Sequence, residues 1–234
     1  MMSTMRPARV LELAALPATG LSAGAFAALS AIRGKRFFHP DGVSFEAAVT
    51  FDDSSPLPLR GEADALVRLS RGMGLPEGLP DVLGLAVKLP DLGQDFLFAT
   101  SGDDAVSRHL LFPSSGFFRR SYSSVLPYEC AGRTIVLGAR ADRSLVDLEG
   151  QQMGDVRRHV GTREVRFDLT WGPAGTGEVH AFASLRLEGP HIGALAFNPF
   201  NSVPGLRPAG ALNRLRLETY RRSQEARPDS SATA

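Results

Sequence analysis

Two groups of residues could carry chemistry if their types alone are considered. Gly72 and Gly74 resemble half of a dinucleotide-binding loop, but the next glycine and the helix of such a loop are missing. Cys130 could serve as a nucleophile beside His159 or His180, but nothing in their spacing supports such an arrangement. Both groups are therefore interpreted as structural.

A third set of residues is informative because of its order along the chain. It comprises Arg36 and His39, Val67 to Ser70, Asp81 to Lys88, Leu111 to Pro113, Phe197 to Pro199, and finally Arg216, Tyr220 and Arg227. In this order and at these spacings the series resembles the catalase superfamily, from about residue 36 to about residue 227. Its most specific parts are the final block and the stretch from 67 to 88. The chain is shorter than a typical catalase, so the resemblance implies a minimal relative that consists of the barrel alone.

The resemblance implies that the chain binds one haem b and that Tyr220 is the ligand of the iron. A phenol normally keeps its proton, so an iron-binding phenolate needs a positive charge nearby. Arg216, one helical turn before Tyr220, could supply that charge. By the same resemblance the haem propionates would be bound by arginine side chains, namely Arg36, Arg68 and Arg227.

On the opposite side of the haem, the resemblance places His39 and Ser70. His39 would move a proton between the two oxygens of a bound peroxide, which is general acid–base catalysis. Ser70 would bind the other imidazole nitrogen and thereby fix the tautomer of the ring. Phe112 would pack against the haem ring.

One position departs from the family pattern. An alignment without gaps from Asp95 to Phe112 places Ala99 where catalases carry their essential asparagine. An amide there orients peroxide and stabilises developing charge, and the loss of one such donor can cost ~100-fold or more in rate. We therefore expect weak or no catalase activity, and a distal pocket that is open to a larger substrate.

Composition and charge are those of an ordinary globular protein. Hydrophobic residues make up 43% and charged residues 22% of the 234 residues, which suits one domain with a core and a cofactor pocket. The net charge of +1 gives no reason to expect a nucleic acid or an anionic membrane as partner. Cys130 is the single cysteine, which excludes an intramolecular disulfide and a cysteine-based zinc site. A cytoplasmic location is expected.

Short segments of alternating polarity predict the scaffold that positions these residues. They predict strands over residues 43–51, 63–70, 82–89, 95–100, 134–139, 164–171 and 178–187. Because no helices are expected between them, they favour an α+β fold built on an antiparallel β-barrel of about eight strands that could hold a ligand at its mouth. We further expect a helical N-terminal arm over 1–34, a C-terminal helix over 205–227 that carries Tyr220, and a disordered tail over 228–234. All belong to a single domain of residues 1–234, and the apolar stretch from 10 to 31 is too interrupted to span a membrane.

The resemblance, together with the departure at Ala99, implies a haem peroxidase that acts on organic hydroperoxides or hydrogen peroxide. Its second partner would be a small organic reductant or a lipid-like hydroperoxide. Two alternatives stay open. The altered position 99 is compatible with a haem-dependent hydroperoxide dehydratase or lyase, and the three propionate-binding arginines would suffice for a haem- or lipid-binding barrel without turnover. A homo-oligomer is compatible with the sequence, although nothing in the sequence indicates one.

Overall fold

The computed structural model describes residues 42–76 and 78–210. The predicted N-terminal arm, the part of the predicted C-terminal helix beyond residue 210 and the predicted tail lie outside these ranges. Of the eight predicted site residues, Ser70, Arg68 and Phe112 are described, whereas Arg36, His39, Arg216, Tyr220 and Arg227 are not. Within the described ranges, no helix is long and apolar enough to cross a membrane.

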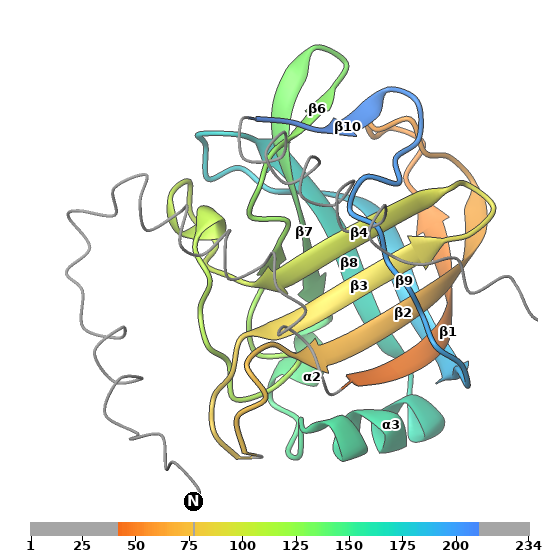
Figure 1. Cartoon of the computed structure of the whole chain (residues 1–234), viewed down its shortest axis with the longest axis vertical. Coiled ribbons are helices and arrows are strands. Elements are labelled where there is room, and N and C mark those ends of the chain that lie inside the picture. The colour runs from red at the N-terminus through yellow and green to blue at the C-terminus, as the bar shows by residue number, and fades with distance from the viewer. Residues whose placement is uncertain (1–41, 77, 211–234) are drawn as a thin grey trace, which may run out of the picture.

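Ten strands form one sheet in the described part of the chain. They are β1 (Gly42–Phe51), β2 (Glu62–Arg71), β3 (Leu83–Leu89), β4 (Gln94–Thr100), β5 (Tyr122–Ser123), β6 (Tyr128–Cys130), β7 (Arg133–Ala141), β8 (Val165–Pro173), β9 (His180–Pro190) and β10 (Leu206–Pro208). Eight of them close an antiparallel barrel in the order β1-β2-β3-β4-β5-β7-β8-β9, with β9 paired back to β1 (Figure 1). The short strands β6 and β10 extend the sheet from β7 outside this ring. The predicted eight-stranded antiparallel barrel is confirmed.

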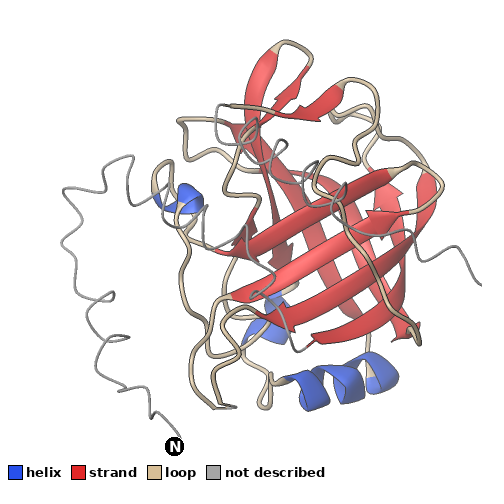
Figure 2. Cartoon of the chain, in the orientation of Figure 1, coloured by secondary structure: helices blue, strands red, loops and turns tan. Residues whose placement is uncertain are grey.

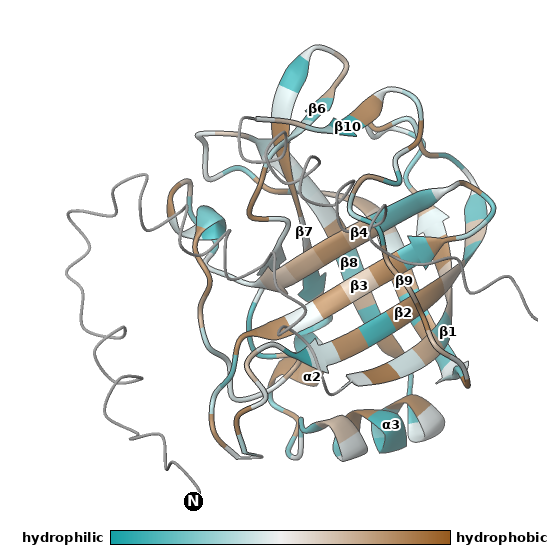
Figure 3. Ribbon diagram, viewed as in Figure 1, coloured by the Kyte–Doolittle hydropathy of each residue, from teal (hydrophilic) through white to brown (hydrophobic). Residues whose placement is uncertain are grey.

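The alternation along each strand explains why these residues form a barrel. In β1, Val43, Phe45, Ala47, Val49 and Phe51 are buried, and the residues between them are half-buried or exposed. The same alternation of brown and teal or pale residues is visible along β2 in Figure 3. Burial of one side of every strand provides most of the driving force for the fold, because each large apolar side chain removed from water contributes about 1.5–3 kcal/mol.

The barrel interior is filled by side chains. Phe45, Phe96, Phe167 and Phe182 are each at most 1% exposed, and the rings of Phe96 and Phe182 lie edge to face with centroids 6.1 Å apart. At one end Phe117 and Phe118 are equally buried, and the Tyr122 hydroxyl donates a 2.8 Å hydrogen bond to the Phe117 carbonyl. The interior is thus a packed core, as is usual for a small barrel, and a ligand must bind outside it.

Two α-helices, α2 (Arg143–Val146) and α3 (Met153–Thr162), lie between β7 and β8 (Figure 2). The expectation of strands without intervening helices is therefore wrong at this point. Helix α3 begins with a capping box, in which the Gln152 amide N–H donates to the Asp155 carboxylate over 3.2 Å. It buries Val156 and Val160 against β9 and β1. These two residues and the partly buried Met153 form the apolar face of the helix, which was not predicted from the sequence.

The predicted C-terminal helix begins too early. Leu206–Pro208 form strand β10, which pairs with Tyr128–Cys130 of β6. The prediction of a helix from residue 205 is therefore wrong for residues 206–208, because Leu206 packs into the core as part of a strand. The remainder of that prediction, including Tyr220, falls outside the described residues.

Candidate functional site

Arg68 and Ser70 lie on the outer side of the barrel. Their neighbours Val67 and Leu69 are fully buried and point into the core. Because successive side chains of a strand point to opposite faces, Arg68 and Ser70 point away from the core. Ser70 is nevertheless only 4% exposed, so this part of the outer face is covered and is not free surface.

The strand register aligns these two residues with others on the outer face, since residues directly opposite in an antiparallel pair share a face. We define the outer patch as two rows of paired residues. The first row is Ser44, Arg68, Ala86 and Leu97, and the second is Gly42, Ser70, Gly84 and Ala99. Every residue of the second row has a small side chain or none. The outer patch is flat over β3, where the two rows contribute only Ala86 and Gly84.

Gly42 has a specific reason to lack a side chain. A Cβ at this position would come within 2.8 Å of the Arg68 Nε and 2.9 Å of its Cζ. The guanidinium of Arg68 therefore lies directly against the backbone at the start of β1. The strand pairing explains this placement. Gly42 pairs with Ser70, and Arg68 lies two residues before Ser70 on the same face of β2, so its long side chain reaches the backbone of Gly42.

Phe112 is held beside the second row by Thr100, which follows Ala99. The Phe112 amide donates to the Thr100 carbonyl over 2.9 Å, and the Thr100 hydroxyl donates to the Phe112 carbonyl over 2.6 Å. The same hydroxyl oxygen accepts a 3.1 Å hydrogen bond from the Leu83 amide. The Arg120 guanidinium carbon lies 5.5 Å from the centre of the Phe112 ring, within the range of a cation–π contact. Phe112 is thus held at the β4 end of the second row, two strands away from Ser70.

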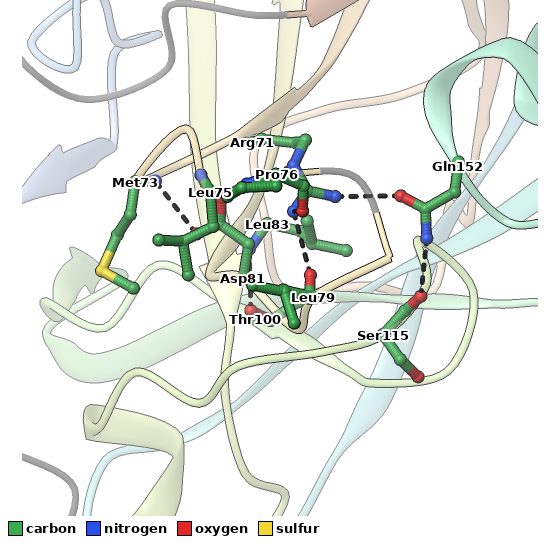
Figure 4. Close-up of polar contacts among 10 residues, drawn as sticks. All are labelled: Arg71, Met73, Leu75, Pro76, Leu79, Asp81, Leu83, Thr100, Ser115 and Gln152. Carbon is green, nitrogen blue, oxygen red and sulfur yellow. Dashed lines mark hydrogen bonds and ion pairs between the residues drawn. The ribbon is translucent and has the colours of Figure 1, made fainter. Parts of the chain in front are cut away.

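A buried ionic network supports this end of the barrel from the inner side (Figure 4). Arg71, next to Ser70, has its Nε 3.6 Å from an Asp81 carboxylate oxygen, and both side chains are almost completely buried. The Asp81 carboxylate also accepts hydrogen bonds from the amides of Met73 at 3.0 Å and Leu75 at 3.3 Å. These contacts give Asp81 a structural role, because its carboxylate holds the turn that contains Gly72 and Gly74.

The same network reaches helix α3 through Gln152. Arg71 donates to the Gln152 side-chain oxygen over 2.9 Å and to the Leu79 carbonyl over 2.9 Å, and Gln152 donates to the Ser115 carbonyl over 3.2 Å. Sequence reasoning missed Arg71 and Gln152. They are 81 positions apart, and no local pattern connects them.

Residues 191–203, which we call the crossing segment, run across the outer face from β1 to β4 (Figure 1). The segment starts where the His191 amide donates to the Ser44 carbonyl over 2.9 Å. At its other end the Asn198 amide donates to the Asp95 carboxylate over 2.7 Å, and Lys88 lies 3.5 Å from the same carboxylate. The predicted Phe197 to Pro199 motif therefore fastens this segment beside the outer patch.

The remaining histidines and the cysteine have structural surroundings. His109 Nδ1 lies 2.8 Å from the Val125 carbonyl oxygen, and His159 Nε2 lies 3.0 Å from that of Gly150. Among the described residues, no group of three or more histidine, cysteine, aspartate or glutamate side chains could hold a metal ion. Cys130 is buried, and this burial raises the pKa of its thiol, which disfavours the reactive thiolate.

Comparison with solved structures identifies the architecture. The crystal structure of a fungal catalase superposes with a TM-score of 0.64 at 14% identity over 90% of this chain, and catalase A from Saccharomyces cerevisiae with a TM-score of 0.59 at 12% identity over 90%. This chain has the catalase fold. It spans 63% and 65% of those two catalases, less than two thirds of their length. No protein-family model and no curated protein matches the sequence.

The catalase fold typically binds haem, and the described residues fit such a group. The second row of the outer patch has no bulky side chain that would obstruct a planar macrocycle, because Gly42, Ser70, Gly84 and Ala99 carry at most a methyl or hydroxymethyl group. Arg68 supplies a cation for a carboxylate beside this flat surface. The iron ligand Tyr220, its partner Arg216, the distal His39 and the arginines 36 and 227 lie outside the described residues and stay predictions.

Proposed function

We propose that this chain is a haem-dependent peroxidase and that its outer patch is the haem-binding face. The observation that carries the proposal is the outward placement of Arg68 and Ser70 on a patch of small residues, in a barrel with the catalase fold. The Ser70, Gly84 and Ala99 row and the hydrogen bonds between Thr100 and Phe112 support a place for Phe112 at the β4 end of the same patch.

The haem would supply the iron at which a peroxide is reduced, and the chain would supply the groups that hold and protonate the reactants. Arg68, together with Arg36 and Arg227, would pair with the propionates. Tyr220 would coordinate the iron, with Arg216 favouring its ionised form. These assignments divide the site into a proximal part, near the C-terminus, and a distal part built on β1 to β4.

On the distal side, His39 would accept a proton from the nearer peroxide oxygen and return it to the leaving oxygen. His39 precedes Gly42 by three residues, and Gly42 pairs with Ser70, so the chain that carries His39 joins the barrel opposite Ser70. This connection supports a hydrogen bond from the imidazole N–H to the Ser70 hydroxyl oxygen, which would fix the tautomer of His39 and leave its other nitrogen free to accept a proton.

Ala99 favours organic hydroperoxides over dismutation of hydrogen peroxide. It belongs to the same row as Ser70, so it would face the proposed haem without a hydrogen-bond donor in its side chain. Without an amide there, a second peroxide is poorly oriented, while a bulkier substrate gains space. The peroxide and a small organic reductant are the proposed partners, and a cytoplasmic location remains a prediction.

The experiment is haem reconstitution followed by activity assays. The wild type should show the spectrum of a five-coordinate ferric haem with a tyrosinate ligand, and it should oxidise a reducing dye faster with tert-butyl hydroperoxide than with hydrogen peroxide. Tyr220→Phe should change the spectrum, and His39→Ala should keep bound haem but lose peroxide-dependent oxidation. An unchanged spectrum in Tyr220→Phe would refute the ligand assignment, and unchanged activity in His39→Ala would refute the distal mechanism.

A hydroperoxide dehydratase or lyase is the second candidate, and Ala99 is the observation that favours it. Such an enzyme rearranges its substrate without net reduction, so it needs neither a reductant nor a donor that stabilises a second peroxide. Incubation with fatty-acid hydroperoxides in the absence of reductant separates the two functions. Rearranged products would support the dehydratase or lyase, and recovery of intact hydroperoxide would support the peroxidase.

A further inference from the structure

A cavity of about 620 Å³ lies at the end of the barrel where β4 and β7 end and β3 and β5 begin. Its lining comes from these strand ends, including Ser101, Ser121 and Ala141, and from the first and last residues of helix α2. It lies outside the plug that Phe117 and Phe118 form in the barrel. A volume of this size is typical of sites for small organic molecules.

The charged lining of the cavity is strongly unbalanced. It contains four arginines and a single carboxylate, Asp103. Only Arg140 is paired with that carboxylate, at 3.1 Å. Within residues 42–76 and 78–210, the side chains of Arg119 and Arg143 form no ion pair or hydrogen bond. The cavity therefore presents cationic groups that are ready to bind an anion.

The lining also has a gradient of polarity. The four arginines are exposed, whereas Phe118 is 1% exposed and Ala141 and Val146 are half-buried. Charge thus lies at the mouth of the cavity and apolar surface lies deeper. A ligand that matches both must carry an anionic group at one end and an apolar body at the other.

We propose that this cavity binds an organic carboxylate with an apolar body. A guanidinium can hold a carboxylate through two parallel hydrogen bonds, and Arg119 and Arg143 are the side chains available to do so. The apolar body would lie against Phe118, Ala141 and Val146. A compact polyanion would satisfy the arginines but would leave this apolar lining in contact with polar groups, which is unfavourable.

The position of the cavity connects it with the proposed haem site. Pro113 lines the cavity, and the preceding residue, Phe112, borders the outer patch. Arg120 lines the cavity and also lies over the Phe112 ring. On the basis of the proposed function, we assign the bound carboxylate as the organic substrate, so that the enzyme prefers hydroperoxides or reductants that bear a carboxylate.

The test is isothermal titration calorimetry of the full chain as purified, with decanoate, decanol and inorganic phosphate as separate probes. Decanoate should bind about tenfold or more tightly than decanol, because only the carboxylate forms charge-assisted hydrogen bonds. The double variant Arg119→Gln/Arg143→Gln should weaken decanoate binding about tenfold and leave decanol binding unchanged. Arg163→Gln, which alters an exposed arginine that does not line the cavity, is the matched control and should behave as the wild type.

Equal affinity for decanoate and decanol would overturn the proposal, as would phosphate binding as tight as that of decanoate. Wild-type affinity for decanoate in the double variant would overturn it too. The titration needs neither haem nor peroxide. Decanoate binding in a protein without peroxidase activity would therefore refute the proposed function alone, whereas peroxidase activity without decanoate binding would refute the carboxylate site alone.

Discussion

The inner and outer sides of strands β1 to β4 have opposite characters although they alternate along the same chain. On β3, Leu85 and Val87 are fully buried in the core, while Gly84 and Ala86 face outward in the outer patch. The inner side is large and apolar because it must fill the barrel. The second row of the outer patch is small and flat beside the Arg68 cation. Stability and binding are therefore assigned to different residues of the same strands, and substitutions should separate them.

The largest effect on stability is expected from the inner side. Phe96→Ala should lower the free energy of unfolding by about 3–5 kcal/mol, because it removes a fully buried ring that stacks on Phe98 and meets Phe182 edge to face. Urea denaturation measures this change. Leu97→Ala, at the next position but on the half-buried outer side, should cost less. Equal losses for both variants would contradict the division between the two sides.

The next largest effect should come from the buried ion pair at the end of the barrel. Asp81→Asn should destabilise the fold by about 3 kcal/mol, because it leaves the Arg71 guanidinium buried without its counter-charge. Asp103→Asn is the matched control, since its pair with Arg140 is exposed and should contribute less than about 1 kcal/mol. If both substitutions change the denaturation midpoint by the same amount, burial of the Arg71 and Asp81 pair has no energetic importance.

A smaller effect, on binding and not on stability, is expected from Arg68→Gln. Loss of one charge-assisted contact to a carboxylate should weaken haem binding about tenfold. The free energy of unfolding should fall by less than in Phe96→Ala, because Arg68 is half-buried on the outer side and not part of the core. Haem titration followed by absorbance measures the affinity. Arg186→Gln, an exposed arginine paired with Glu188 on β9, should bind haem as the wild type does; equal weakening in both variants would show only a general charge effect.

The smallest effect is expected from Asp104, in the loop after β4. Hydrogen bonds from the Ser107 hydroxyl and amide and from the Val106 amide lower the pKa of Asp104 from 3.8 to about 2. Because the folded pKa lies below the unfolded one, the stabilisation is complete above pH 3.8 and is lost as the pH falls towards about 2. Carboxyl NMR titration measures this pKa. Ser107→Ala should raise it, and an unchanged value would show that these hydrogen bonds do not form in solution.

Much of the barrel could be predicted from the sequence because its long strands alternate cleanly. Val43 to Phe51 and the stretch around Val67 and Leu69 show a period of two that survives in the structure. Strands of two or three residues, such as β5 and β10, are too short to show a period. Their pairing depends on tertiary contacts, such as that of Leu206 with Cys130.

The candidate site was only partly predictable for a similar reason. The motifs identified Arg68, Ser70 and Phe112, and alternation places the first two on the same side of β2. That this is the outer side follows only from which side buries Val67 and Leu69 in the closed barrel. The arginine-lined cavity could not be predicted at all, because Arg119 and Arg143 meet only when the ends of several strands and helix α2 come together.

The most direct test of the central claim is haem titration of Ala86→Phe. Ala86 lies between Arg68 and Leu97 in the first row of the outer patch, and a phenyl ring there would occupy the proposed haem-binding face without altering the core. We predict at least about tenfold weaker haem binding, with a denaturation curve close to that of the wild type. Wild-type haem affinity in Ala86→Phe, with the fold intact, would contradict the assignment of the outer face of β1 to β4 as the haem site.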